Sequence, residues 1–166
     1  MSWWEPAALD RTRWQALVDP VLERVARALD GERFPHGLLL AGPPGLGREL
    51  AAVEIAVRLV CPDAAGPWND SACSGRVRGG LHPDVVAVMA SEGSTQIKIE
   101  QVREIVDSAP GRPFEGRHRV WIIDGVEAAR FHREPANAFL KVLEEPPDHV
   151  RFLLLAAKPE AVLPTI

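Results

Sequence analysis

The chain has 166 residues, of which 46% are hydrophobic and 25% are charged, and 23 acidic against 19 basic side chains give a formal net charge of −4. This composition is that of an ordinary globular domain, and it excludes global disorder and collagen-like order. The acidic balance also argues against a protein that coats nucleic acid through bulk charge. Because no segment approaches 18 uncharged apolar residues and no secretion signal opens the chain, we expect neither a membrane span nor export.

The first half of the chain predicts a helix, a strand and a second helix. Apolar residues at helical spacing predict a helix over residues 14–29, and Asp30 and Gly31 supply its end. The apolar run 38–41 predicts a buried strand that is closed by a glycine-rich turn, and the alanine-rich segment 49–60 predicts a helix. Residues 61–83 lack a sustained period, which predicts an irregular insertion or small lobe.

The second half alternates apolar strands with helices. Strands are predicted at 85–89, 97–99, 120–124 and 152–157, and helices at 100–109 and 136–144. Because these strands are apolar throughout, they are typical of a mainly parallel sheet that is covered on both faces. The sequence therefore predicts one α/β domain over residues 1–166, with a five-stranded sheet between two layers of helices.

The turn at residues 42–49 (GPPGLGRE) has the spacing of a phosphate-binding loop, with Gly42 and Gly47 as its first and sixth residues and Gly45 between them. An active loop continues with lysine and with serine or threonine, whereas this one continues with Arg48 and Glu49. A carboxylate about 4 Å from a phosphate oxygen is unfavourable by about 4 kcal/mol at an effective dielectric constant near 20. The turn is therefore interpreted either as a tight turn kept for packing or as a site that binds nucleotide without hydrolysing it.

The strand at 120–124 ends in a single carboxylate. Asp124 occupies the position of a metal ligand, but Gly125 follows where a second carboxylate would activate water, and Glu127 lies beyond the strand end. We therefore expect Asp124 to be vestigial and the chain to contain no catalytic residue, with neither ATP nor Mg²⁺ as a cofactor.

The two cysteines, Cys61 and Cys73, are too few for a disulfide framework. Together with the missing secretion signal, they indicate a reducing, cytoplasmic location.

Several segments together resemble the bacterial clamp-loader AAA+ family. They are residues 34–40 (FPHGLLL), 82–84 (HPD), 97–103 (IKIEQVR), 120–124 (VWIID) and, most specifically, 136–147 (ANAFLKVLEEPP). The resemblance implies a P-loop NTPase fold of the AAA+ RecA-like type, with lid and collar domains downstream of this chain. It also implies a subunit of the DNA polymerase III holoenzyme that helps to load the sliding clamp onto primed DNA in a hetero-pentameric ring with motor (gamma/tau) and clamp-opening (delta) subunits.

Within this family, the altered turn places the chain among the members that do not hydrolyse ATP. Active members carry polar residues after the last strand, where this chain has Ala156 and Ala157. The resemblance further implies a Ser-Arg-Cys motif soon after Ile166. Two alternatives are an active motor-type ATPase with an unusual loop and a AAA+ protein that binds DNA on its own account.

The family resemblance also implies a zinc module with four cysteines in the insertion. Cys61 and Cys73 match the first two, but the third and fourth places fall near Arg76 and Gly79, which are not zinc ligands. His82, Asp63 or Asp70 could complete a ligand set only by another arrangement. We therefore expect a degenerate module without zinc.

Overall fold

The computed structural model describes residues 11–30, 34–63, 68–90, 94, 96–127 and 133–162. Its sheet is entirely parallel, in the order β1-β4-β3-β2. The strands are β1 (Gly37–Ala41), β2 (Val85–Val88), β3 (Arg119–Asp124) and β4 (Val150–Ala156). The helices are α1 (Arg11–Asp30), α2 (Arg48–Val60), α3 (Ala72–Arg78), α4 (Ile99–Ser108) and α5 (Arg133–Glu144), followed by the 3₁₀ turn η2 (Pro159–Ala161).

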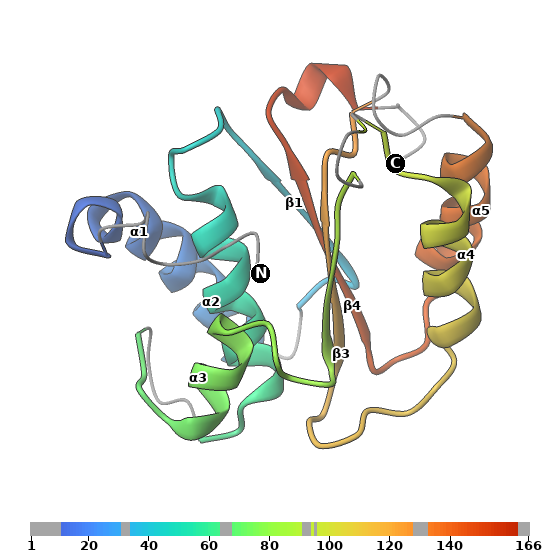
Figure 1. Cartoon of the computed structure of the whole chain (residues 1–166). Coiled ribbons are helices and arrows are strands. Elements are labelled where there is room, and N and C mark those ends of the chain that lie inside the picture. The colour runs from blue at the N-terminus through green and yellow to red at the C-terminus, as the bar shows by residue number, and fades with distance from the viewer. Residues whose placement is uncertain are drawn as a thin grey trace.

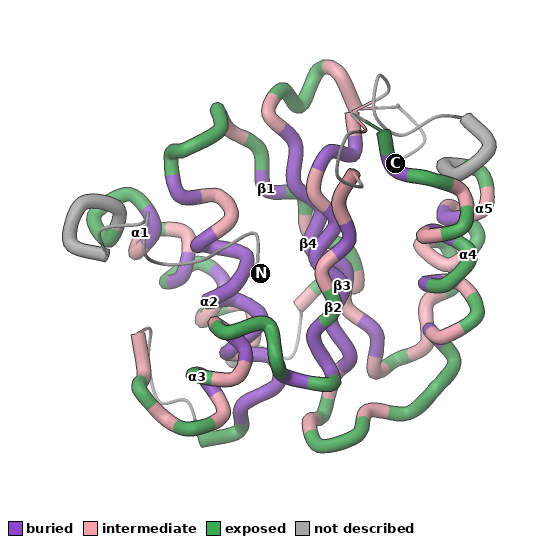
Figure 2. The backbone as a smooth tube through the Cα atoms, in the orientation of Figure 1, coloured by how far each residue is buried: buried purple, intermediate pink, exposed green. Residues whose placement is uncertain are grey.

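Helices cover both faces of the central strands β3 and β4, as their continuous apolar runs predict. The edge strand β1 is not buried on both faces as predicted, because Leu39 is 41% exposed. Helices α1, α2 and α3 lie on one side, and α4 and α5 lie on the other (Figure 1). Strand β3 serves both layers through the alternation of its side chains, because Val120 and Ile122 pack with α2 whereas Trp121 and Ile123 pack with α4 and α5. The buried residues accordingly run through the central strands and α2, while the exposed residues gather in the loops and on the outer helices (Figure 2).

The prediction of five strands is wrong, because the described residues form four. The segment expected as the fifth strand leads into α4 instead: Lys98 is the residue before the helix, and its backbone N–H donates to the side-chain oxygen of Gln101 at 3.0 Å. Gln101 also donates to the carbonyl of Met89 at 2.8 Å. The hydrogen bond from the Lys98 backbone to Gln101 starts the helix at Ile99, and Ile97, 1% exposed, packs beneath it in the core.

The insertion is more ordered than the sequence predicts, since it contains the seven-residue helix α3. Ser71 caps this helix by accepting a hydrogen bond from the backbone N–H of Ser74 at 3.2 Å. Val77 then anchors the helix in the core, where it is fully buried. Because a helix of two turns is marginal in water, the contacts of α3 with α2 determine whether it forms.

Candidate functional site

The glycine-rich turn lies at the carboxyl edge of the sheet, where parallel α/β proteins bind ligands. It follows β1, and the backbone N–H of Gly42 donates to the carbonyl of Ala156 at the end of β4, at 3.0 Å. Gly47, at a φ of 87°, allows the sharp entry into α2. The turn therefore joins the ends of β1 and β4 to the start of a helix, and it places Glu49 in the first helical turn, as the sequence predicts.

Arg48 connects the turn to the neighbouring strands. Its guanidinium donates to the carboxylate of Glu49 at 2.9 Å, to the carbonyl of Gly42 at 3.0 Å and to the carboxylate of Asp124 at 3.1 Å. The Arg48 side chain is only 9% exposed. These three contacts, which we call the Arg48 clasp, place one cation between two carboxylates and the backbone of the turn. The sequence indicated that Glu49 would repel phosphate, but it did not reveal this bridge from α2 to β3.

The residues that follow the carboxyl ends of β3 and β4, at the same edge as the turn, are Gly125, Glu127 and Ala157. Gly125 has a φ of 94°, in the left-handed region that favours glycine, and its backbone N–H donates to the carbonyl of Leu155 at 3.0 Å. The carboxylate of Glu127 turns back to β4, where it accepts a hydrogen bond from the backbone N–H of Ala157. The side chain beyond the strand end is thus used to bind the end of β4, and Ala156 and Ala157 present only methyl groups.

A cavity of about 320 Å³ lies beside the turn. Its lining is mainly apolar and comes from α1, β1 and α2; the residues include Leu17, Val18, Val21, Leu40, Leu46 and Ala51, together with Arg48. The cavity borders the Arg48 clasp. The site therefore combines an apolar cavity with the Arg48 clasp, in which Arg48 is already paired with Glu49 and Asp124.

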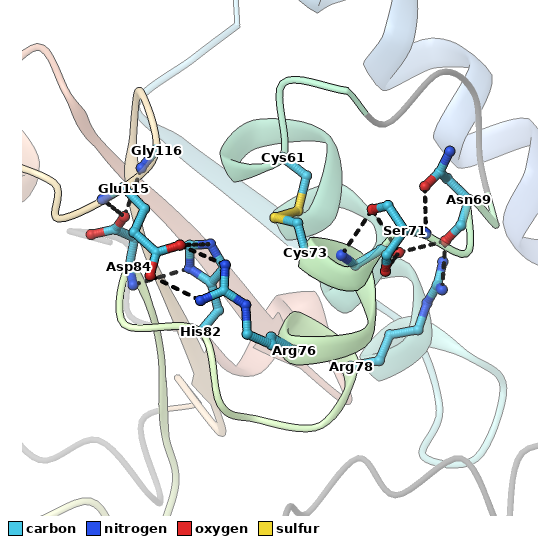
Figure 3. The surroundings of a disulfide bond; sticks show 11 residues. Cys61, Asn69, Ser71, Cys73, Arg76, Arg78, His82, Asp84, Glu115 and Gly116 are labelled. Carbon is cyan, nitrogen blue, oxygen red and sulfur yellow. Dashed lines mark hydrogen bonds and ion pairs between the residues drawn. A yellow bond between two sulfur atoms is a disulfide. The ribbon is translucent and has the colours of Figure 1, made fainter.

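The two cysteines, which the sequence analysis takes as too few for a disulfide framework and as a sign of a reducing location, are bonded to each other. Cys61 and Cys73 form a disulfide that joins the end of α2 to the start of α3 (Figure 3). Their separation of 12 residues does not by itself predict a disulfide, because pairing cannot be deduced from spacing alone. His82 lies beside them, and its ring nitrogen and the two sulfur atoms lie within 4.8 Å of one another. Asp63 and Asp70 do not belong to this group among the described residues.

A buried carboxylate joins the start of β2 to the loop before β3. Asp84, which is 1% exposed, accepts hydrogen bonds from the backbone N–H groups of Phe114 (2.6 Å), Glu115 (2.8 Å) and Gly116 (2.9 Å). Burial alone would raise the pKa of Asp84, but the three backbone donors outweigh it and lower the pKa. The sequence motif at 82–84 located this residue without indicating its role, which is to hold the loop before β3.

Replacing Asp84 with asparagine is expected to lower the free energy of unfolding by about 2 kcal/mol at pH 7, because an amide loses the charged acceptor and turns an N–H group toward a backbone donor. The folded pKa of Asp84 lies below its unfolded value of about 4, so this stabilisation is complete above pH 4 and is lost as the pH falls toward the folded pKa. Urea unfolding at pH 7 and pH 3 tests this: the difference between wild type and variant should shrink at pH 3, and an unchanged difference would contradict it.

The fold and the turn together define the class of protein: a parallel α/β domain whose glycine-rich turn joins the first strand to a helix at the carboxyl edge of the sheet. Residues 18–166 match the family described as DNA polymerase III, delta subunit, and the chain belongs to this family. Among the described residues, the helices include none that is long and apolar enough to cross a membrane.

Relatives in the family carry several subunit names. The chain is 32% identical over 148 residues to the DNA polymerase III subunit gamma of Buchnera aphidicola, covering 88% of this chain and 40% of the relative. It is 34% identical over 133 residues to subunit delta' of Pseudomonas aeruginosa, covering 79% and 40%. Over 157 residues it is 29% identical to subunit delta' of Escherichia coli, covering 93% and 46%. The chain thus spans less than half the length of these relatives.

A solved structure supports the fold. The crystal structure of a DNA polymerase III gamma subunit-related protein from Thermotoga maritima aligns with a TM-score of 0.59 and 20% identity, over 90% of this chain and 42% of that one. Residues 163–166, after which the resemblance implies a Ser-Arg-Cys motif, lie outside the described residues, so this expectation stays a prediction.

Proposed function

We propose that this chain is the amino-terminal AAA+ module of a delta prime-type clamp-loader subunit that does not hydrolyse ATP. Similarity to relatives does not distinguish this role from that of a motor, since gamma and delta' subunits match the chain about equally well. The proposal therefore rests on the chemistry of the turn, and the Arg48 clasp is the observation that carries it.

A triphosphate with Mg²⁺ does not fit the residues at this turn. The phosphate-binding position would need a compact ammonium group and a hydroxyl ligand for the metal. Instead, the Arg48 guanidinium is held against Glu49 and Asp124, so an incoming phosphate would have to compete with two carboxylates for one cation. It would also approach the carboxylate of Glu49, whose side chain is only 18% exposed, and two negative charges repel each other in such a partly buried site.

The hydrolytic side of the site supports the same proposal. Gly125 provides no general base, and the carboxylate of Glu127 is engaged by the backbone of Ala157. At the end of β4, Ala156 and Ala157 have no side-chain group that could contact a γ-phosphate. In the complete protein, such a subunit would act as a rigid member of a ring with gamma/tau and delta subunits. This ring would load the sliding clamp onto primed DNA.

Nucleotide binding and turnover test this function. We expect a fluorescent ATP analogue with Mg²⁺ to show no saturable binding at micromolar concentrations, and phosphate release to remain at the level of a protein-free blank, with a known ATPase as the positive control. Micromolar affinity together with turnover would instead assign the chain to the motor class. Salt-sensitive binding of the isolated chain to primed DNA would favour a direct DNA-binding role.

A further inference from the structure

The insertion departs from the four-cysteine zinc module that the family resemblance implies, because it contains only Cys61 and Cys73. A zinc ion would need four ligands here, and the described residues bring together only three candidate donors, Cys61, Cys73 and His82. The contacts around each donor decide whether this group fits a metal.

The donor atoms are already engaged. The two sulfur atoms are bonded to each other, so neither is a thiolate. The Nδ1 atom of His82 accepts a hydrogen bond from the backbone N–H of Asp84 at 3.2 Å, which places the proton of the neutral ring on Nε2. A metal ligand needs a free lone pair on one ring nitrogen, and this tautomer leaves none available on the Nε2 side.

Charge also opposes a cation at this place. Arg76 stands near the third expected ligand position, and its guanidinium binds the carboxylate of Glu115 through two hydrogen bonds of 2.8 and 2.5 Å (Figure 3). Burial and then the charge of Arg76 lower the pKa of His82, which shows that the surroundings already disfavour a positive charge on this ring. The residues present therefore do not fit zinc.

The disulfide provides the cross-link that a metal would otherwise supply. It joins the end of α2 to the first turn of α3, which is too short to be stable alone. We define the α3 lobe as residues 68–82. Apart from the disulfide, the lobe is tied to α2 mainly by the ion pair between Arg78 and Glu54 and by the burial of Val77.

We propose that Cys61 and Cys73 form a reversible thiol–disulfide site that replaces the metal in this lobe, and that reduction by a dithiol loosens the α3 lobe. Cys73 is partly exposed whereas Cys61 is 2% exposed, so Cys73 is the sulfur that a reductant reaches. A thiolate of the dithiol attacks the Cys73 sulfur, the S–S bond breaks, and its electron pair leaves on Cys61, which takes a proton from solvent. The second thiol of the reductant then displaces Cys73, so that the dithiol is oxidised to its disulfide and the cysteine pair gains two electrons and two protons.

Limited proteolysis reports on the lobe directly. Trypsin cleaves after Arg76 and Arg78, which both lie on α3, and mass spectrometry identifies these cuts. With dithiothreitol, we expect cleavage at these sites to become at least about tenfold faster, and the melting temperature to fall by roughly 5–10 °C, as the loss of a cross-link across a short loop predicts. Removing the reductant and reoxidising the protein should reverse both effects, and EDTA added to the oxidised protein should change neither.

Two controls separate the disulfide from a metal and from general effects of the reductant. The double variant Cys61→Ser/Cys73→Ser should be cleaved like the reduced wild type and should not respond to dithiothreitol. Adding one equivalent of Zn²⁺ to the reduced wild type should neither restore protection nor produce a chelator-releasable bound ion. Unchanged cleavage on reduction would overturn the proposal, as would zinc that binds stoichiometrically and restores protection.

Discussion

Replacing Arg78 with methionine is expected to lower the free energy of unfolding by about 3–5 kcal/mol, the typical effect of removing one partner from a buried ion pair. Arg78 donates to the two carboxylate oxygens of Glu54 at 2.6 and 2.9 Å, and Glu54 is 1% exposed in the middle of α2. The backbone N–H of Trp68 adds a third hydrogen bond at 3.3 Å. Without the arginine, the carboxylate would remain buried with most of its compensation lost.

The neighbouring ion pair provides a matched control. Arg76 lies on the same helix and binds Glu115 with similar geometry, but its side chain is 41% exposed and that of Glu115 is 45% exposed. Replacing Arg76 with methionine should therefore change the free energy of unfolding far less than replacing Arg78, because solvent screens this exposed pair. Urea unfolding under oxidising conditions measures both variants. Equal effects of the two substitutions would show that burial does not set the strength of the Glu54–Arg78 pair.

A third variant separates the loss of the pair from the burial of an unpaired charge. In Glu54→Leu/Arg78→Met, both charges are replaced by apolar groups of comparable size, so no uncompensated carboxylate remains. This double variant should recover most of the stability that Arg78→Met loses. If it is as unstable as the single variant, the arginine acts mainly through its hydrogen bond to the carbonyl of Asn69, at 2.7 Å, rather than through Glu54.

The sequence predicts the layers of the fold better than its small elements. Strands β3 and β4 are long apolar runs, so their burial on both faces follows directly from their composition. The prediction of a strand at 97–99 was wrong, because three alternating residues are too few to predict a strand. One side chain, that of Gln101, makes the hydrogen bonds that start a helix there instead. Helix α3 was missed because its stability comes from distant residues, above all Glu54, rather than from its own periodicity.

The candidate site shows the same division between local and distant information. The spacing of the glycines predicted the turn, and Glu49 predicted a negative charge where a phosphate would bind. The Arg48 clasp, however, joins residues 76 positions apart, and no local pattern connects Arg48 with Asp124. The pairing of Cys61 with Cys73 likewise depends on α3 lying against the end of α2, which the sequence did not reveal.

If the clasp excludes nucleotide, removing it should admit nucleotide. The variant Arg48→Lys/Glu49→Thr introduces a compact ammonium group and a hydroxyl. It also removes the carboxylate of Glu49, which binds the Arg48 guanidinium in the wild type. Relief of about 4 kcal/mol of repulsion corresponds to an affinity for MgATP roughly a thousandfold higher than that of the wild type. Isothermal titration calorimetry measures the change, and equal affinities of variant and wild type would show that the clasp does not control access.

The single variant Arg48→Lys is the matched control, because its ammonium group can still pair with the carboxylates of Glu49 and Asp124 and the carboxylate of Glu49 remains in place. Its affinity should stay close to that of the wild type, so that the gain in the double variant is assigned to the change at Glu49, which removes a carboxylate and adds a hydroxyl. Neither variant should release phosphate, since Gly125 provides no base and its φ of 94° would strain a glutamate placed there. Binding without turnover would thus separate the loss of nucleotide binding from the loss of hydrolysis. Two substitutions can reverse the loss of binding, whereas the loss of hydrolysis is also fixed by the backbone conformation at the end of β3.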